Sequence, residues 1–345
     1  MRPVRHPPLG RDLELARFDE ALTSSASRPE LVVVRGIAGI GKTSLIRELA
    51  ARAAESGWVT ASTASDDPHD ACATLGALLT SLLHGRDRLV ESLDERTRAV
   101  LHRVIPIPGP VLPLELPVTR HQLVGAMQRL TEAAGRSRGV VLLVDDVERC
   151  DEATLEVLSL LGDLPMGRLV VVLAYRTPAA NPAVERALSR AARFQPPLVL
   201  DLEPLDPTSA AEVVRAAAPH LTDAQLATVL ARADGIPLFL VELANSPGGV
   251  RGEEAVSSAL EARLLDFERH EVRLLRRLAL GEGVLDLDDV HALTGADEHE
   301  SDLLLDRGLA AGVLVVEETG YRFRHELVRS LLAAQVPPHH RAAAL

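Results

Sequence analysis

Short apolar runs rich in β-branched residues alternate with stretches of helical periodicity as far as about residue 205. The helical stretches place apolar residues three or four positions apart, as with Leu45 and Leu49 or Leu155 and Leu158. Strand-length apolar runs that alternate with helices are typical of a parallel sheet covered by helices on both faces. The expected strands are Leu31–Val34, Trp58–Thr63, Val140–Val144, Leu169–Leu173 and Leu198–Leu202.

Longer connections and helices separate these strands. Helices are expected at Ser44–Ala54, Arg120–Ala134 and Glu152–Leu161. Prolines are concentrated in Ile105–Pro117, which predicts a long loop there. After Pro207 the strand pattern stops, and only helical stretches follow for a while. These helices are expected at Ser209–Ala218, Asp223–Ala233 and Pro237–Ala244.

The last part of the chain begins after Asn245–Gly252, whose Gly, Ser and Pro residues indicate a hinge. Helical patterns are followed by two short strands around Glu318–Gly320, and this succession predicts a winged helix. The expected helices are Ala255–Phe267, His270–Leu280, Leu287–Leu293 and Glu298–Leu309, and the expected strands are Gly312–Glu317 and Tyr321–Phe323.

Composition narrows the possible partners. Apolar residues make up 47% of the 345 residues and aromatic residues 2%, so the cores are expected to consist of Leu, Val and Ala. The net charge of -12 makes nucleic acid a poor partner, because phosphate backbones require positive surfaces. The longest apolar runs, such as Gly139–Val144, have strand length, and no secretory leader is visible. We therefore expect no membrane contact and a cytoplasmic location.

The strongest chemical signal is a glycine-rich segment between the first strand and the first helix after it. Its pattern is G-x-x-x-x-G-K-[ST], which predicts a P-loop in this strand–loop–helix context. Lys42 is the only lysine in the chain, and we expect it on a solvated loop. Its charge would neutralise the β- and γ-phosphates of ATP, while the Thr43 hydroxyl would ligate Mg²⁺. The expected nucleotide-binding residues of this segment are Gly36, Ile37, Ala38, Gly39, Ile40, Gly41, Lys42, Thr43 and Ser44.

A second signal lies at the end of the third expected strand, where two aspartates follow directly. This is the pattern of a Walker B element, and Asp145 is expected to hold Mg²⁺. Asp146 is the first candidate for orienting the attacking water, and Glu148 is the second. Asp151 is expected to be the N-cap of the next helix. Arg176 follows the fourth strand and is a candidate sensor of the γ-phosphate, because the carboxyl ends of such strands line the ligand crevice.

Taken together and in order, these motifs resemble the STAND class of signal-transduction ATPases. Within that class the chain is similar to the N-terminal part of the large ATP-binding LuxR-type bacterial regulators. The segments that carry the resemblance are Leu9–Glu14, the P-loop, Val144–Asp146, Tyr175–Arg176, Gly235–Leu238 and Phe323–His325.

The resemblance implies further roles. Gly10 and Arg11 would lie on the adenine and ribose side of the nucleotide, and Pro237 would pack on the adenine. His325 would contact the β-phosphate of ADP and stabilise the resting state. The family's aspartate after this histidine is Glu326 here, and its tryptophan shortly after Walker B is Arg149.

These signals predict an α/β P-loop NTPase of the ASCE/STAND type, with a five-stranded parallel sheet, a helical domain and a winged-helix domain. Its expected ligands are ATP or ADP with Mg²⁺. Other expected partners are proteins, or further sensor and effector domains, and a nucleotide-dependent oligomer is a possibility. The expected domains are residues 1–205 for the nucleotide, 206–250 for a helical lid, 251–335 for the winged helix and 336–345 for the start of another helix.

Three functions remain open at this stage. The first is a nucleotide-operated switch with slow hydrolysis, in a signal-transduction or transcriptional regulator. The second is an AAA+-like motor, a class that commonly has Glu where this chain has Asp146. The third is a DNA-binding winged helix, which the acidic segment Asp297–Leu309 disfavours.

Overall fold

The computed structural model describes most of the chain in two compact units. The first unit comprises Met1–Arg35 and Lys42–Leu202, and the second comprises Gly36–Gly41 and Glu203–Leu345. The described residues are 8–25, 28–65, 72–107, 118–136, 138–161, 168–177, 182–192, 196–245, 264, 267–281, 283–324 and 326–337.

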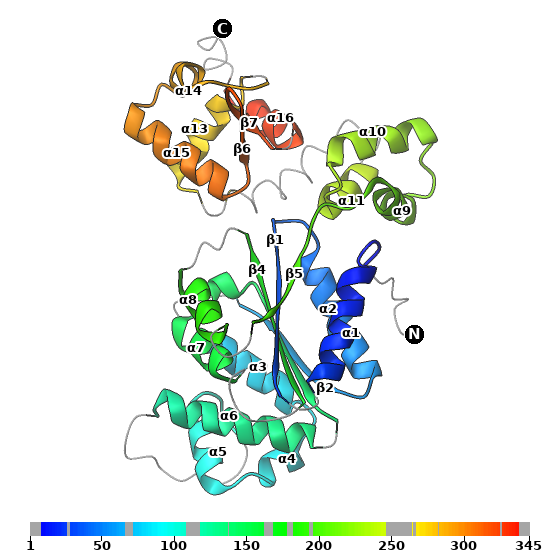
Figure 1. Cartoon of the computed structure of the whole chain (residues 1–345), viewed down its shortest axis with the longest axis vertical. Coiled ribbons are helices and arrows are strands. Elements are labelled where there is room, and N and C mark those ends of the chain that lie inside the picture. The colour runs from blue at the N-terminus through cyan, green and yellow to red at the C-terminus, as the bar shows by residue number, and fades with distance from the viewer. Residues whose placement is uncertain are drawn as a thin grey trace. The chain divides into compact units, whose positions relative to one another are not determined.

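The first unit is built on a five-stranded parallel sheet with the strand order β2-β3-β4-β1-β5 (Figure 1). Its register pairs Val33 with Val199 and Val141 with Val170. β3 and β4 are buried along most of their length, so their runs of apolar residues are explained by helices on both faces. The strands are β1 (Glu30–Gly36), β2 (Val59–Ala64), β3 (Val140–Asp145), β4 (Leu169–Arg176) and β5 (Leu198–Asp201).

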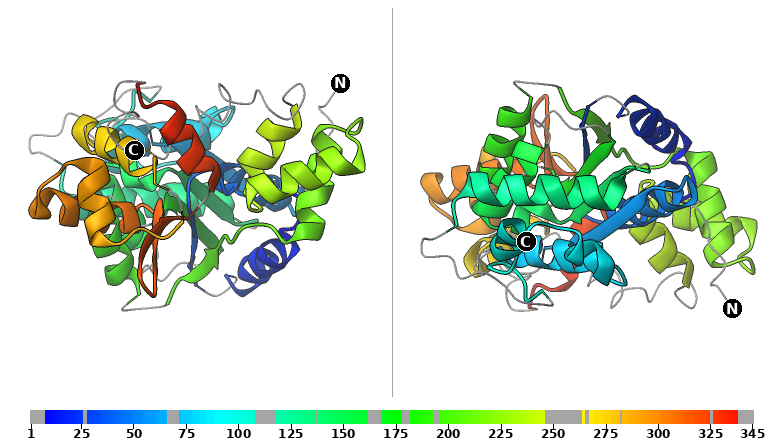
Figure 2. Two further views of the ribbon diagram at one scale, coloured as in Figure 1. Left: turned by 90° about the horizontal axis from the view of Figure 1, so that it is seen from above. Right: turned by 90° about the horizontal axis from the view of Figure 1, so that it is seen from below.

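Alternate strand residues point to opposite faces of the sheet, and each face has its own helices. Val33, Leu142 and Val171 belong to the core shared with α3, α6, α7 and α8, whereas α1 and α2 lie on the other side of the sheet in Figure 1. Seen from below in Figure 2, α6 and the short helices α4 and α5 lie toward the viewer, at the end of the sheet opposite the carboxyl end of β1. The helices are α1 (Asp12–Ser24), α2 (Lys42–Glu55), α3 (Ala73–Leu83), α4 (Asp87–Glu91), α5 (Glu95–Leu101), α6 (Arg120–Gly135), the 3-10 turn η1 (Val147–Arg149), α7 (Glu152–Leu161) and α8 (Pro182–Ala191).

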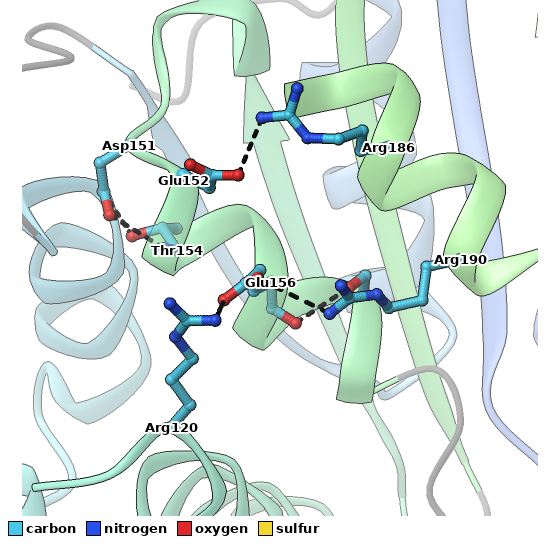
Figure 3. Close-up of polar contacts among 8 residues, drawn as sticks. Arg120, Asp151, Glu152, Thr154, Glu156, Arg186 and Arg190 are labelled. Atoms are coloured by element: carbon cyan, nitrogen blue, oxygen red, sulfur yellow. Dashed lines mark hydrogen bonds and ion pairs between the residues drawn. The ribbon is translucent and has the colours of Figure 1, made fainter. Parts of the chain in front are cut away.

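Polar contacts fix α7 against its neighbours (Figure 3). Asp151 caps the helix by accepting hydrogen bonds from the Thr154 amide at 2.9 Å and from the Thr154 hydroxyl at 2.6 Å. Glu156 forms ion pairs with Arg120 and with Arg190 of α8. The cap confirms the expectation that Asp151 begins a helix, and the ion pairs join α7 to α8 and to the first residue of α6.

The second unit is helical apart from one hairpin. α13, α14 and α15 precede the hairpin of β6 and β7, which pairs Leu314 with Phe323, and Tyr321 also bridges to Leu285. Three helices and a hairpin confirm the winged-helix expectation. The elements are α9 (Pro207–Ala217), α10 (Asp223–Ala233), α11 (Pro237–Asn245), α13 (Arg269–Leu278), α14 (Leu287–Thr294), α15 (Glu298–Ala310), β6 (Leu314–Glu317), β7 (Gly320–Phe323) and α16 (Glu326–Ala334).

The strands predicted from the apolar runs of the sequence agree closely with the strands of the structure. Each of the five expected strands of the sheet is present, with ends that coincide or differ by at most three residues. The sequence pattern did not predict α3, α4, α5 or α8, which lie in the connections between strands. Most of the predicted loop, the hinge and the helix Ala255–Phe267 lie outside the described residues. Among the helices that the structure describes, none combines the length and the apolar character needed to cross a membrane.

Gly139 provides a test of packing in the first unit. A Cβ on this residue would lie 2.4 Å from the Trp58 ring, and its φ of +92° is unfavourable for any side chain. We expect Gly139→Ala to lower the free energy of unfolding by about 2–4 kcal/mol. Urea titration followed by the fluorescence of Trp58, the only tryptophan, measures the loss.

Gly57→Ala is the matched control. Gly57 also has a positive φ, +83°, but nothing lies within 4 Å of its added Cβ. Its substitution should cost only the backbone term, about 1 kcal/mol. Equal losses in the two variants would mean that the contact with Trp58 is unimportant.

Candidate functional site

The glycine-rich segment forms the loop between β1 and α2. Gly39 and Gly41 have φ angles of +79° and +101°, which side chains other than glycine rarely adopt. The Ile40 amide donates to the Ile37 carbonyl at 3.4 Å, so the loop turns tightly before α2 begins at Lys42. The first amides of a helix have no partner within the helix and attract anions. The local backbone therefore has the form that a P-loop needs.

Lys42 lies in a different environment from the solvated loop expected for it. It is the first residue of α2, and only 6% of it is exposed. Burial lowers the pKa of Lys42 to about 8, and the negative charges of Glu148, Asp146 and Asp145 partly offset that effect. The correction has a simple cause, because α2 packs on the sheet and draws its first side chain toward the carboxylates after β3.

Thr43 and Asp145 are brought together, as predicted for a magnesium site. The Thr43 hydroxyl donates to Asp145 Oδ2 at 2.6 Å, and the Asp146 amide donates to Asp145 Oδ1 at 3.0 Å. Burial raises the pKa of Asp145, and the hydrogen bond from Thr43 opposes this. A hydroxyl and a carboxylate are oxygen ligands that suit Mg²⁺, which takes most of its other ligands from water and phosphate.

Binding of Mg²⁺ at this position would depend on bound nucleotide. Within the described part of the chain, no group of three or more His, Cys, Asp or Glu side chains is placed to hold a metal ion. Thr43 and Asp145 would thus supply two ligands at most, and phosphate oxygens and water would complete the octahedron.

Arg176, Asp146 and Glu148 form a charged cluster next to this pair. Arg176 Nε lies 3.3 Å from Glu148 Oε1 and 3.8 Å from Asp146 Oδ1. Asp146 adopts a left-handed backbone conformation with φ of +51°, which turns the chain sharply at the end of β3. Burial raises the pKa of Glu148, whose side chain is 9% exposed. Both candidate water-orienting carboxylates therefore face the candidate sensor arginine.

Pro237 and its neighbours contact the glycine-rich loop within the second unit. The Leu238 amide donates to the Gly39 carbonyl at 3.2 Å, and the position of a Cβ on Gly39 lies 3.1 Å from the Leu238 side chain. A Cβ on Gly41 would lie 3.9 Å from Pro237. Pro237 was predicted as a site residue from the sequence, whereas Leu238 was named only as the last residue of the segment Gly235–Leu238.

The structure describes Gly10, Arg11 and Ser44 of the remaining predicted site residues, but not His325. Gly10 has a φ of +70°, and Arg11 is 6% exposed at the start of α1, where it pairs with Glu14 at 3.2 Å. Their contact with adenine or ribose stays a prediction. Ser44 lies in the first turn of α2 and is exposed. His325 lies outside the described residues, so its role in the resting state also stays a prediction.

Comparison with known families identifies this arrangement. Residues 7–172 match the AAA ATPase domain family. This region, just under half of the chain, is therefore similar to AAA ATPase domains. The matched region includes the glycine-rich loop, the Thr43–Asp145 pair and Asp146 with Glu148, and the family to which it corresponds binds nucleotide, typically with Mg²⁺.

A solved structure supports the fold. A Walker-type ATPase of Pyrococcus abyssi is 18% identical with a TM-score of 0.62, and the match covers 93% of this chain and 95% of that one. A STAND protein with a tetratricopeptide-repeat sensor from Pyrococcus horikoshii is 17% identical with a TM-score of 0.44, over 98% of this chain and 45% of that one. Cdc6p of Pyrobaculum aerophilum is 14% identical with a TM-score of 0.43, over 96% and 94%. The search of curated proteins gave no match.

Lys42→Met separates the binding role of the lysine from its effect on stability. Methionine keeps the length of the side chain but removes a buried charge. At pH 7 the nucleotide-free variant should be more stable in urea than the parent by about 1–3 kcal/mol, because a desolvated ammonium group is costly. Calorimetry should find no ATP binding. Tight ATP binding by this variant would refute the P-loop assignment.

Thr43 allows a direct test of the magnesium pair. Thr43→Ser keeps the hydroxyl that donates to Asp145, whereas Thr43→Val keeps the shape and removes it. ATP affinity is measured with Mg²⁺ and with a chelator. We expect Thr43→Val to lose the benefit of Mg²⁺, about 10-fold or more in affinity, and Thr43→Ser to retain most of it. If Mg²⁺ strengthens ATP binding equally in both variants, Thr43 is not a ligand.

Proposed function

We propose that this chain is an ATP- and ADP-binding switch with slow hydrolysis, the regulatory ATPase module of a signal-transduction or transcriptional regulator. The AAA-type domain supplies nucleotide binding and the capacity for hydrolysis. The proposal of a switch, as opposed to a rapid enzyme, rests mainly on the contacts of Arg176.

Arg176 pairs with both carboxylates that could orient water for attack on the γ-phosphate. A cation at this distance favours the charged carboxylate but also competes with water for its oxygens. To contact a γ-phosphate, Arg176 would have to exchange a carboxylate for the phosphate. A side chain that distinguishes ATP from ADP in this way gives the nucleotide the differential contacts that a two-state switch requires.

The side chain after the metal-binding aspartate also favours slow turnover. Asp146 is one methylene shorter than the glutamate common in AAA+ motors, and its carboxylate is 28% exposed and faces Arg176. We therefore expect steady-state hydrolysis on the order of one per minute or less, below the usual enzyme range of about 1–10³ per second.

A motor of the AAA+ kind is the second candidate, and the family match of residues 7–172 is the observation that favours it. The two functions make different demands on rate, because a motor must turn over continuously to do work, whereas a switch must remain in one nucleotide state. Rapid steady-state hydrolysis would select the motor.

The winged helix is proposed to act on proteins. α15 exposes Glu298, Glu300, Asp302 and Asp306, so this helix would repel a phosphate backbone. Protein partners, or sensor and effector domains beyond the part described here, are the expected recipients of the signal. A role in transcription, as in the LuxR-type regulators, is part of this proposal and follows from the resemblance of the motifs.

Two carboxylate variants test which acid orients the water. Asp146→Asn should lower single-turnover hydrolysis about 10-fold or more while ATP binding survives, and Glu148→Gln should change it little. Glu152→Gln is the control, since Glu152 is an exposed acid of α7 that pairs with Arg186. The opposite order of effects would assign the role to Glu148.

The nucleotide that copurifies tests the switch itself. The purified protein is denatured, and the released nucleotide is identified by chromatography. The switch is supported by bound ADP that exchanges slowly. An empty site combined with rapid hydrolysis would contradict it.

A further inference from the structure

α13 carries a row of positive charge that is unusual in so acidic a chain. Successive helix positions turn by about 100°, which places these side chains on one side, opposite the buried Leu275 and Leu278. Like charges three or four positions apart repel each other. The members of this row, called the basic row below, are Arg269, Arg273, Arg276 and Arg277.

The basic row has little compensation within the described residues. Arg277 donates to the Thr294 carbonyl at 2.9 Å, and the Arg276 Nε is buried without a hydrogen-bond partner. No described carboxylate forms an ion pair with any of the four arginines, although acidic residues outnumber basic ones in the chain as a whole. Arg269 and Arg273 are the exposed members of the row, and an exposed guanidinium group can bind a carboxylate through two parallel hydrogen bonds.

A cavity of about 410 Å³ lies beside the basic row. Arg273, Arg276 and Arg277 line it together with the apolar Leu274 and Val336 and with the acidic Glu300. The cavity therefore offers positive charge and an apolar wall at the same place. Nucleic acid fits this poorly, because Glu300 and the acidic side chains of α15 would repel its continuous phosphate chain.

α15 of the same domain presents the complementary chemistry. Glu298, Asp302 and Asp306 are spaced four residues apart on one exposed side, and no described cation pairs with them. Leu303 lies among them and is 49% exposed, which is high for a large apolar side chain. This acidic row combines carboxylates with an apolar residue, as the cavity requires.

We infer that the basic row and cavity of one copy of this chain bind the acidic row of α15 in a second copy. The occupant of the cavity is thus another winged-helix domain of the same protein. The inference is independent of the proposed nucleotide switch, because all of these residues lie on α13–α16 of the second unit.

The geometry makes this contact head-to-tail. Arg307 of α15 binds Glu271 of α13 at 2.6 Å, so that side of α15 faces its own α13. Asp302 and Asp306 lie away from it by more than a quarter turn, given about 100° per residue. One surface of the domain therefore contributes the basic row to the contact, and a different surface contributes the acidic row. Such heterologous contacts build rings or open chains.

Charge reversal provides the test. One variant carries Arg269→Glu with Arg273→Glu, and the other carries Asp302→Arg with Asp306→Arg. All four side chains are exposed, so the fold should survive, as circular dichroism can verify. The full chain is studied by sedimentation velocity over a range of concentrations, at low and high salt, without nucleotide and with ADP or ATP.

The parent should associate at low salt in at least one nucleotide state, and high salt should weaken the association. Each variant alone should associate about tenfold more weakly or not at all. An equimolar mixture of the two variants should associate again, because each surface of one is then opposite in charge to its partner surface on the other.

The control carries Arg88→Glu with Arg96→Glu, two exposed arginines of the α4–α5 region, and changes the net charge as much as the arginine variant of α13 does. It should associate like the parent. A parent that remains monomeric under all these conditions would overturn the inference and leave the cavity to another acidic protein. Failure of the mixed variants to associate would overturn it as well, as would normal association of either variant alone.

Discussion

The burial of the Lys42 ammonium group is the constraint on which the nucleotide site depends. A desolvated charge is tolerated only where opposite charges lie close by. Here Asp145, Asp146 and Glu148 follow β3 and stabilise the charged form, while Arg176 from the next strand, β4, opposes it. The parallel sheet makes this possible, because it delivers the ends of neighbouring strands to one edge.

The same charges limit what the site can do before nucleotide arrives. Thr43 and Asp145 satisfy each other through a short hydrogen bond, and Arg176 occupies the two acids that follow. A triphosphate with Mg²⁺ would replace these contacts with stronger ones, since it brings both the anion that Lys42 and Arg176 attract and the cation that Asp145 attracts. The nucleotide would therefore complete the charge balance of the site.

Charge is distributed differently in the second unit. Its winged-helix domain separates basic side chains on α13 from acidic side chains on α15, and few of them pair within the domain. Separation of this kind costs energy through like-charge repulsion along each helix. In the first unit, by contrast, exposed charges such as Arg186 and Glu152 pair across neighbouring helices. The proposed contact between winged-helix domains rests on this contrast.

The sequence by itself determined the sheet, the P-loop and the Walker B element. Strand-length apolar runs, a glycine pattern with one lysine, and two aspartates after a buried run are all local signals, and local signals are visible in sequence. It also predicted the cap at Asp151 and the winged-helix succession.

Only the tertiary structure decided which of these residues face each other. It placed Lys42 in a buried position instead of on a solvated loop, paired Arg176 with both candidate acids, and brought Leu238 against the glycine-rich loop. It likewise showed that the arginines of α13 lack carboxylate partners within the part of the chain it describes. These are relations between segments far apart in sequence, and they depend on strand order and helix packing, which no short pattern of residues encodes.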